Sequence, residues 1–160
     1  MRKVIVNSTP IIALSKAGEL DLLKRMYSEI TIPEAVYQEV TEKNDIVKEE
    51  IRNNSSWIKV ASISDSADKK MYKAKLHDGE VEVMILAQEC DADLVMIDDL
   101  AARKTAEYLG LNLTGTLGVL LKAKSDGLID RVMPIIREME RHEIYFSESL
   151  IEKIKKIADE

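Results

Sequence analysis

The sequence predicts an α/β protein, a three-layer α/β/α sandwich around a central, mostly parallel sheet of four to five strands. The apolar runs Val4-Ile5-Val6 and Leu94-Val95-Met96-Ile97 are continuous rather than alternating, as in strands that are covered on both faces. Helical segments separate the runs, which favours right-handed crossovers and parallel pairing. The length of 160 residues fits one domain, predicted to span 1–160, and no repeat or Gly/Ser-rich linker divides it.

The first half of the chain alternates strands with helices. After a strand at 4–6, Ser8-Thr9-Pro10 is typical of a helix start, with a hydroxyl N-cap and proline in the first turn, and this helix runs to Gly18. The elements predicted next are a helix at 19–27, a strand at 30–32, a helix opened by Pro33 and running to about Val40, a charged helix at 45–53 and a strand at 57–60.

The second half continues this pattern. The polar stretch 62–77 is expected to end as a surface helix. Val81-Glu82-Val83 alternates like a strand, but the length of the 79–89 segment favours a helix. The remaining elements predicted are a strand at 94–97, a helix at 100–109 closed by Gly110, a short strand at 111–114, a helix from 116 to about 124, and helices near 131–140 and 148–158.

Composition narrows the classes of function. The net charge of −6 argues against broad non-specific DNA binding, which needs a basic face. No apolar run approaches the about 20 residues that span a bilayer, and Asn7 and Pro10 interrupt the N-terminal run, so we expect a cytoplasmic protein. With a single cysteine, Cys90, and two distant histidines, a zinc site is not expected. Any metal would be a hard cation such as Mg²⁺ or Mn²⁺, held by oxygen ligands.

Acidic residues follow the predicted strands and open the helices. Asp98 and Asp99 end the 94–97 run, and Asn7 ends the first strand. If those two strands are neighbours, their carboxyl ends share one crevice, where open parallel sheets bind ligands. Glu39 and Glu80 lie on helices that could reach the same edge. Each acid also has a simpler explanation, as a solvated helix residue or as an N-terminal helix charge with Asp78 as the cap. A divalent cation would explain their shared location.

The chain resembles the PIN-domain family, close to the VapC-type toxin ribonucleases. The likeness covers nearly the whole chain and is carried in order by the segments Val4–Leu14, Ile32–Val40, Asp78–Ala87 and Leu94–Arg103. A further segment, Gly115–Lys124, is similar to the tail of a subgroup described as PIN-like nucleic-acid-binding proteins.

The resemblance implies one or two Mg²⁺ or Mn²⁺ ions bound by acids, and hydrolysis of RNA phosphodiester bonds. Asn7, Glu39, Glu80 and Asp99 match the four family positions, with Asp98 as an additional or alternative ligand and the four acids as the catalytic set. A homodimer and a small antitoxin protein are the partners it implies.

Hydroxyl and basic groups near the same crevice are candidates for binding substrate. Ser8 or Thr9 could hydrogen-bond a phosphate together with helix N–H groups, and Thr116 could flank the crevice, although N-capping and turn chemistry are the favoured roles for these residues. Arg103 lies one turn after Asp99 and is expected to pair with it, with a phosphate contact as the alternative.

Asn7 departs from the family pattern, which usually has aspartate at this position. An amide supplies one neutral oxygen and no negative charge, so metal affinity should fall. Two hypotheses therefore stand: an RNA-cleaving enzyme, the toxin of a toxin–antitoxin pair, and a catalytically weak or inactive module that binds RNA or a protein partner. A receiver domain or an aspartate-nucleophile phosphatase fits poorly, because the first strand ends in Asn7-Ser8.

An apolar surface for self-association is one further expectation. Its candidate residues lie on the helices predicted at 19–27 and after Pro33, although such residues are more often core: Leu20, Leu23, Tyr27 and Tyr37.

Overall fold

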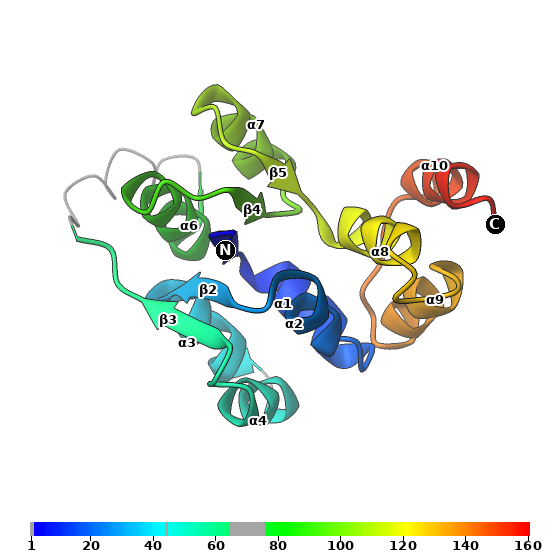
Figure 1. Cartoon of the computed structure of the whole chain (residues 1–160), viewed down its shortest axis with the longest axis horizontal. Helices are drawn as coiled ribbons and strands as arrows, with labels where there is room; N and C mark the ends of the chain where they lie inside the picture. Colours follow the sequence, from blue (N-terminus) through cyan, green and yellow to red (C-terminus); the bar gives the residue numbers. More distant parts are fainter. Residues whose placement is uncertain (1, 44, 65–75) are drawn as a thin grey trace.

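The computed structural model describes residues 2–43, 45–64 and 76–160. Its strands form one five-stranded sheet in the order β3-β2-β1-β4-β5, and each neighbouring pair is parallel (Figure 1). The three-layer α/β/α prediction is confirmed. The strands are β1 (Val4–Val6), β2 (Ile30–Pro33), β3 (Ile58–Ala61), β4 (Leu94–Met96) and β5 (Leu113–Thr114).

Helices connect and cover these strands. Helices α3 and α6 pack against each other and against β2, α6 also contacts β1, and α7 packs beside β5. The helix α1 reaches α3 and α4 as well as α8 and α9. The helices are α1 (Ser8–Lys16), α2 (Asp21–Tyr27), α3 (Glu34–Lys43), α4 (Asp45–Asn53), α6 (Asp78–Glu89), α7 (Leu100–Tyr108), α8 (Thr116–Ser125), α9 (Met133–Arg141) and α10 (Glu148–Ala158).

The strand order places a topological switch point between β1 and β4. From β1 the chain builds outward through β2 to β3, and then returns to place β4 and β5 on the other side of β1. The register pairs Val6 with Met96, so the two strands end at the same level. Open α/β sheets bind ligands at such switch points, beyond the carboxyl ends of the parallel strands.

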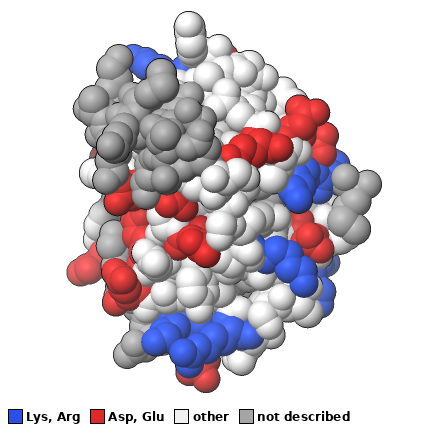
Figure 2. All heavy atoms as spheres, turned by 90° about the vertical axis from the view of Figure 1, so that its left-hand side faces the viewer, with Lys and Arg blue, Asp and Glu red and all other residues white. Residues whose placement is uncertain are grey.

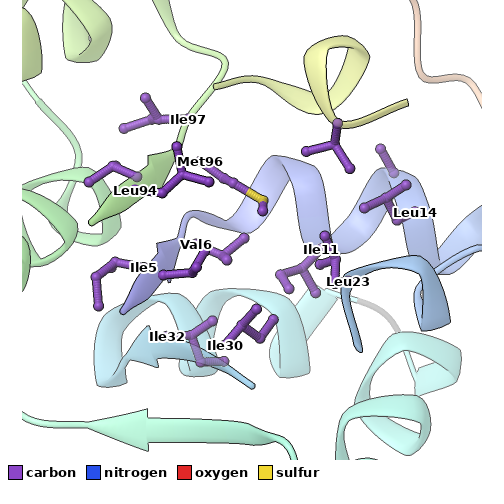
Figure 3. Close-up of a cluster of buried hydrophobic side chains, with 14 of the residues drawn as sticks. Ile5, Val6, Ile11, Leu14, Leu23, Ile30, Ile32, Leu94, Met96 and Ile97 are labelled. Atoms are coloured by element: carbon purple, nitrogen blue, oxygen red, sulfur yellow. The ribbon is translucent and has the colours of Figure 1, made fainter. Parts of the chain in front are cut away.

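The core lies along the two central strands. All three residues of β1 and all three of β4 are buried, which requires cover on both faces of the sheet. Figure 3 shows their side chains packed with Ile11 and Leu14 of α1, Leu23 of α2 and two isoleucines of β2. This packing holds the ends of β1 and β4 rigidly side by side.

Several details differ from the prediction. The cap of α1 is Asn7 rather than Ser8, and α6 is capped by His77 rather than Asp78. Pro33 ends β2, so that α3 begins at Glu34 and continues past Val40 to Lys43. The predicted strand at 111–114 forms only at Leu113–Thr114. The surface helix expected at the end of 62–77 falls mainly on 65–75, outside the described residues.

The expected surface for self-association is largely core. Leu20, Leu23 and Tyr27 are buried, and Tyr37 is half-buried against the same cluster. The amphipathic pattern of α2 faces the sheet, so these side chains are not available to a second copy.

The C-terminal helices form a bundle next to α1 (Figure 1). The buried Glu160 carboxylate closes it: the backbone N–H groups of Val132 and Met133 donate to it at 2.8 and 3.0 Å, and Lys124 Nζ lies 3.0 Å away. These bonds cap α9 and hold the end of the chain against α8. Within the described part of the chain, no helix is long and apolar enough to cross a membrane.

Candidate active site

Asn7 lies directly after β1, at the switch point where the carboxyl ends of β1 and β4 meet. Its backbone N–H donates to the Met96 carbonyl at 2.9 Å, which extends the β1–β4 ladder and fixes the position of the side chain. The side chain is buried, and no described group donates a hydrogen bond to Oδ1. Because a buried oxygen without a partner is costly, this atom is suited to accept a hydrogen bond or to bind a cation.

Glu39 reaches the same place from α3. Gly79, the second residue of α6, shows how close the two side chains are: a Cβ at Gly79 would lie 3.0 Å from Glu39 Oε2 and 3.7 Å from Asn7 Oδ1. The two oxygens therefore face one small space, which is open because residue 79 has no side chain. The sequence predicted that Asn7 and Glu39 approach each other, but it gave no signal for this role of Gly79.

Glu80 is the third acid in this region. It is buried in the first turn of α6, and its Oε1 accepts a hydrogen bond from the His77 N–H at 3.0 Å. Burial raises the pKa of Glu80, the His77 hydrogen bond opposes this, and the nearby carboxylates of Asp99 and Glu39 raise the pKa further. Because Asp99 and Glu39 both repel the Glu80 carboxylate, a bound cation would relieve that repulsion.

Asp98 and Asp99 accept hydrogen bonds from different donors within the chain. The carboxylate of Asp98 accepts from the Thr116 N–H at 2.9 Å and from the Thr116 hydroxyl at 2.6 Å. Asp99 caps α7, with Oδ1 accepting from the Ala102 N–H at 2.9 Å. The sequence did not distinguish these roles, because adjacent acids after a strand look alike.

The structure gives different environments to the hydroxyl and basic residues that the sequence suggested for substrate binding. Thr116 is fully buried, so its hydroxyl holds Asp98 instead of lining an open surface. Arg103 does not form the expected pair with Asp99; its Nη1 donates to the Ile97 carbonyl at 3.0 Å. Ser8 is buried in the first turn of α1, whereas Thr9 is exposed there.

Gly115 marks a second close approach. A Cβ there would lie 2.7 Å from Asp98 Oδ1 and 3.1 Å from Arg103 Nη1. Both side chains therefore press against the backbone at the start of α8. A side chain at position 115 would displace the carboxylate or the guanidinium.

Glu82 is an acid that sequence reasoning passed over. It is buried on α6, and its Oε1 accepts from the Ala35 N–H in the first turn of α3 at 3.1 Å. The sequence did indicate that this acid is buried, since Glu82 interrupts an otherwise apolar segment. It also lines an open pocket of about 420 Å³ between α3 and α6, together with Ala35, Gln38, Glu39, Glu42, His77, Asp78 and Gly79.

The side of the molecule that carries α3, α6 and β3 has an uneven charge distribution. Figure 2 shows several acidic side chains gathered on the left of this view, whereas acidic and basic side chains lie together on the right. Among the described residues, no three acidic, histidine or cysteine side chains form a metal-binding group by themselves. Any cation here would also need the Asn7 amide oxygen, water or substrate oxygens.

A family model described as a PIN domain matches residues 3–160. The chain belongs to the PIN-domain family. The recognition from sequence is thereby confirmed at the family level. No curated protein matches the chain. PIN domains have a nuclease-type fold, and they are generally divalent-metal-dependent and act on nucleic acid.

The residues of this PIN domain fit a divalent cation. The orphaned Asn7 Oδ1 faces Glu39 Oε2 across the space at Gly79, and Glu80 lies within electrostatic reach of Glu39 and Asp99. All of these donors are oxygens, which suits Mg²⁺ or Mn²⁺ and leaves coordination positions for water and phosphate.

Proposed function

We propose that this PIN domain is an endoribonuclease that uses Mg²⁺ or Mn²⁺ to hydrolyse RNA phosphodiester bonds. The observation that carries the proposal is the buried Asn7 oxygen, which has no hydrogen-bond donor among the described residues and lies next to Glu39 at the switch point of a nuclease-type fold. A buried polar atom of this kind is rare unless the site binds something. The chemistry of the neighbouring groups makes a cation the best candidate.

Asn7, Glu39, Glu80 and Asp99 would hold the ion. It would supply Lewis-acid activation of a water and neutralisation of charge at the leaving oxygen. Glu39, Glu80 and Asp99 provide the negative charge, while Asn7 contributes one neutral oxygen. Because the family usually has aspartate at position 7, we expect weaker metal binding here than an aspartate would give.

The surrounding groups orient the site and its substrate. Asp98 keeps the start of α8 against the end of β4 through its two bonds from Thr116, so we assign it a positioning role beside its possible ligation. Arg103 braces the same turn through the Ile97 carbonyl. We expect Thr9, which is exposed at the N-terminus of α1, to bind a phosphate with help from the helix dipole, whereas Ser8 is buried in the same turn.

The biological role within this proposal is that of a cytoplasmic toxin. A small antitoxin would neutralise it by placing a basic side chain among these acids, because clustered carboxylates favour a nearby positive charge, whether from a metal ion or from a side chain. A homodimer belongs to the same proposal, although its surface cannot be the buried face of α2. Light scattering of the purified chain checks the dimer.

The test is a calorimetric titration of Mn²⁺ into the parent protein and the variants Asn7→Asp and Asp99→Asn. Asn7→Asp should bind Mn²⁺ more tightly than the parent, because it adds a negative charge at the orphaned oxygen. Asp99→Asn should bind more weakly while keeping the cap of α7, since asparagine is an equally good N-cap. Asp130→Asn, at an exposed acid before α9, is the matched control and should bind like the parent.

Cleavage of a labelled RNA with Mn²⁺ and with EDTA then completes the test. Mn²⁺-dependent cleavage that falls in Asp99→Asn and not in Asp130→Asn supports the proposal. Metal binding only in Asn7→Asp would show a PIN fold that has lost its ion, and would favour the binding-module hypothesis. Equal Mn²⁺ affinity in the parent and Asp99→Asn would remove Asp99 from the site.

A further inference from the structure

The helix that begins at Asp99 carries an unusual exposed face. Among the large apolar side chains that the structure describes, Tyr108 and Leu100 are the most exposed, at 90% and 76%. Both belong to α7, at its last and first positions. Single exposed apolar residues are normal in soluble proteins, but two such residues on one short helix next to a candidate active site call for an explanation.

The two side chains share one side of the helix with Lys104. At about 100° per residue, Leu100, Lys104 and Tyr108 lie within an arc of about 80° and span about 12 Å along the axis. The opposite side of α7 is buried through Ala102 and Ala106. The face is therefore a narrow line of one aliphatic, one basic and one aromatic group, and it starts beside Asp99.

We propose that this face of α7 is a track for single-stranded RNA leading away from the cleavage site, with Tyr108 as a base-stacking platform and Lys104 as a phosphate contact. This inference rests on the proposed ribonuclease function. Single-stranded nucleic acids are bound by aromatic groups that stack on bases and by basic groups that follow the backbone. Arg103 and Lys104 also give α7 more basic than acidic residues, with Glu107 as its one acid.

The shape of this face of α7 favours a single-stranded RNA over a protein partner. A stable protein interface covers about 800 Å² on each side with a contiguous apolar centre. Here Lys104 separates the two large apolar groups, and the flanking positions Ala101 and Glu107 add little apolar surface. At about 3.4 Å per stacked nucleotide, the distance to Tyr108 corresponds to about four nucleotides beyond Leu100.

The experiment compares RNA binding by the full chain and by Tyr108→Ala, measured by fluorescence anisotropy in EDTA so that no cleavage occurs. The probes are labelled single-stranded RNAs of about 12 and about three nucleotides. We expect Tyr108→Ala to weaken binding of the long RNA by about 5- to 150-fold, the range that loss of one stacked base produces. The short RNA should bind equally to both proteins, and Tyr108→Phe should bind like the parent.

The matched control is Tyr145→Ala, which removes another exposed tyrosine from the segment between α9 and α10. It should leave RNA binding unchanged. Unchanged binding of the long RNA by Tyr108→Ala overturns the track, and so does equal weakening by Tyr145→Ala or equal weakening for the short RNA. Cleavage in Mn²⁺ separates the two proposals: a parent that cleaves RNA while Tyr108→Ala keeps its KM refutes only the track.

Discussion

Replacing Gly79 by alanine would test whether the space between α3 and α6 is a metal site. The new methyl group would stand 3.0 Å from Glu39 Oε2, 3.4 Å from Val36 Cγ2 and 3.7 Å from Asn7 Oδ1. It would occupy the space that the two oxygens face. The Glu39 carboxylate is the far end of a flexible side chain and can move by a few tenths of an ångström, so the fold should accept the change.

The effects on stability and on metal binding should have opposite signs. Alanine is favoured over glycine by up to about 1 kcal/mol in a helix, so we expect the free energy of unfolding in EDTA to stay constant or rise by as much as about 1 kcal/mol. Displacing Glu39 should weaken Mn²⁺ binding by about 10- to 100-fold, the usual cost of disturbing the groups that orient a metal ligand. A general loss of structure would lower both quantities together.

Urea unfolding in EDTA and calorimetric Mn²⁺ titration measure the two quantities on the same protein. Gln88→Ala, at an exposed position near the other end of α6, is the control and should leave Mn²⁺ affinity unchanged. A folded Gly79→Ala protein that binds Mn²⁺ as tightly as the parent would refute the reasoning, because Asn7 and Glu39 would then not share an ion.

Three further predictions concern the carboxylates. Burial opposes the charged form of Glu160, but hydrogen bonds from Val132 and Met133 and the Lys124 ammonium outweigh it and lower the pKa of Glu160 from 4.5 to about 2. The contribution of Glu160 to the free energy of unfolding is therefore present above pH 4.5 and is lost as the pH falls towards 2. Glu160→Gln should therefore lower the free energy of unfolding at neutral pH by at most about 3 kcal/mol, with little difference near pH 2. The exposed control Glu152→Gln should leave the free energy of unfolding unchanged at both pH values. Equal urea midpoints for the parent and Glu160→Gln at pH 7 would contradict this prediction. Because burial raises the pKa of Glu80, its charged form is unfavourable in the folded state above pH 4.5. Glu80→Gln should therefore raise the melting temperature in EDTA but reduce the additional stabilisation by Mn²⁺. A lower melting temperature of Glu80→Gln in EDTA would contradict the idea that the carboxylates repel one another. Thr116→Val removes the hydroxyl that donates to Asp98 and should lower the free energy of unfolding by about 1.5–3 kcal/mol, while Thr116→Ser, which keeps the hydroxyl, should lose clearly less in urea titrations.

The order of elements was predictable because it depends on local pattern. Continuous apolar runs indicated the strands, and Pro33 and Gly110 marked breaks close to where helices begin or end. Boundaries were less predictable, since a cap depends on backbone angles at one residue. Asn7 and Ser8 are both good caps by residue type, and only the extended backbone at Asn7 shows which one it is.

The candidate site was predictable as a set of residues but not as an arrangement. Adjacent acids at 98 and 99 are indistinguishable in sequence, yet one is bonded to Thr116 and the other caps α7. The sequence also could not decide whether Leu20 and Leu23 are buried in the core, because an apolar helix face can cover a core or contact a partner.

The sequence by itself determined the family, the alternation of strands and helices, and which oxygen-bearing side chains are candidate ligands, because residue type and local spacing are enough for each. Only the tertiary structure decided that β1 and β4 are neighbours. It also decided that Asn7 Oδ1 is buried near Glu39 with no donor in the described part of the chain, and that Gly79 leaves the space between them open. These facts depend on contacts between segments far apart in the chain. Such contacts follow from how the whole core packs, which no short stretch of sequence specifies.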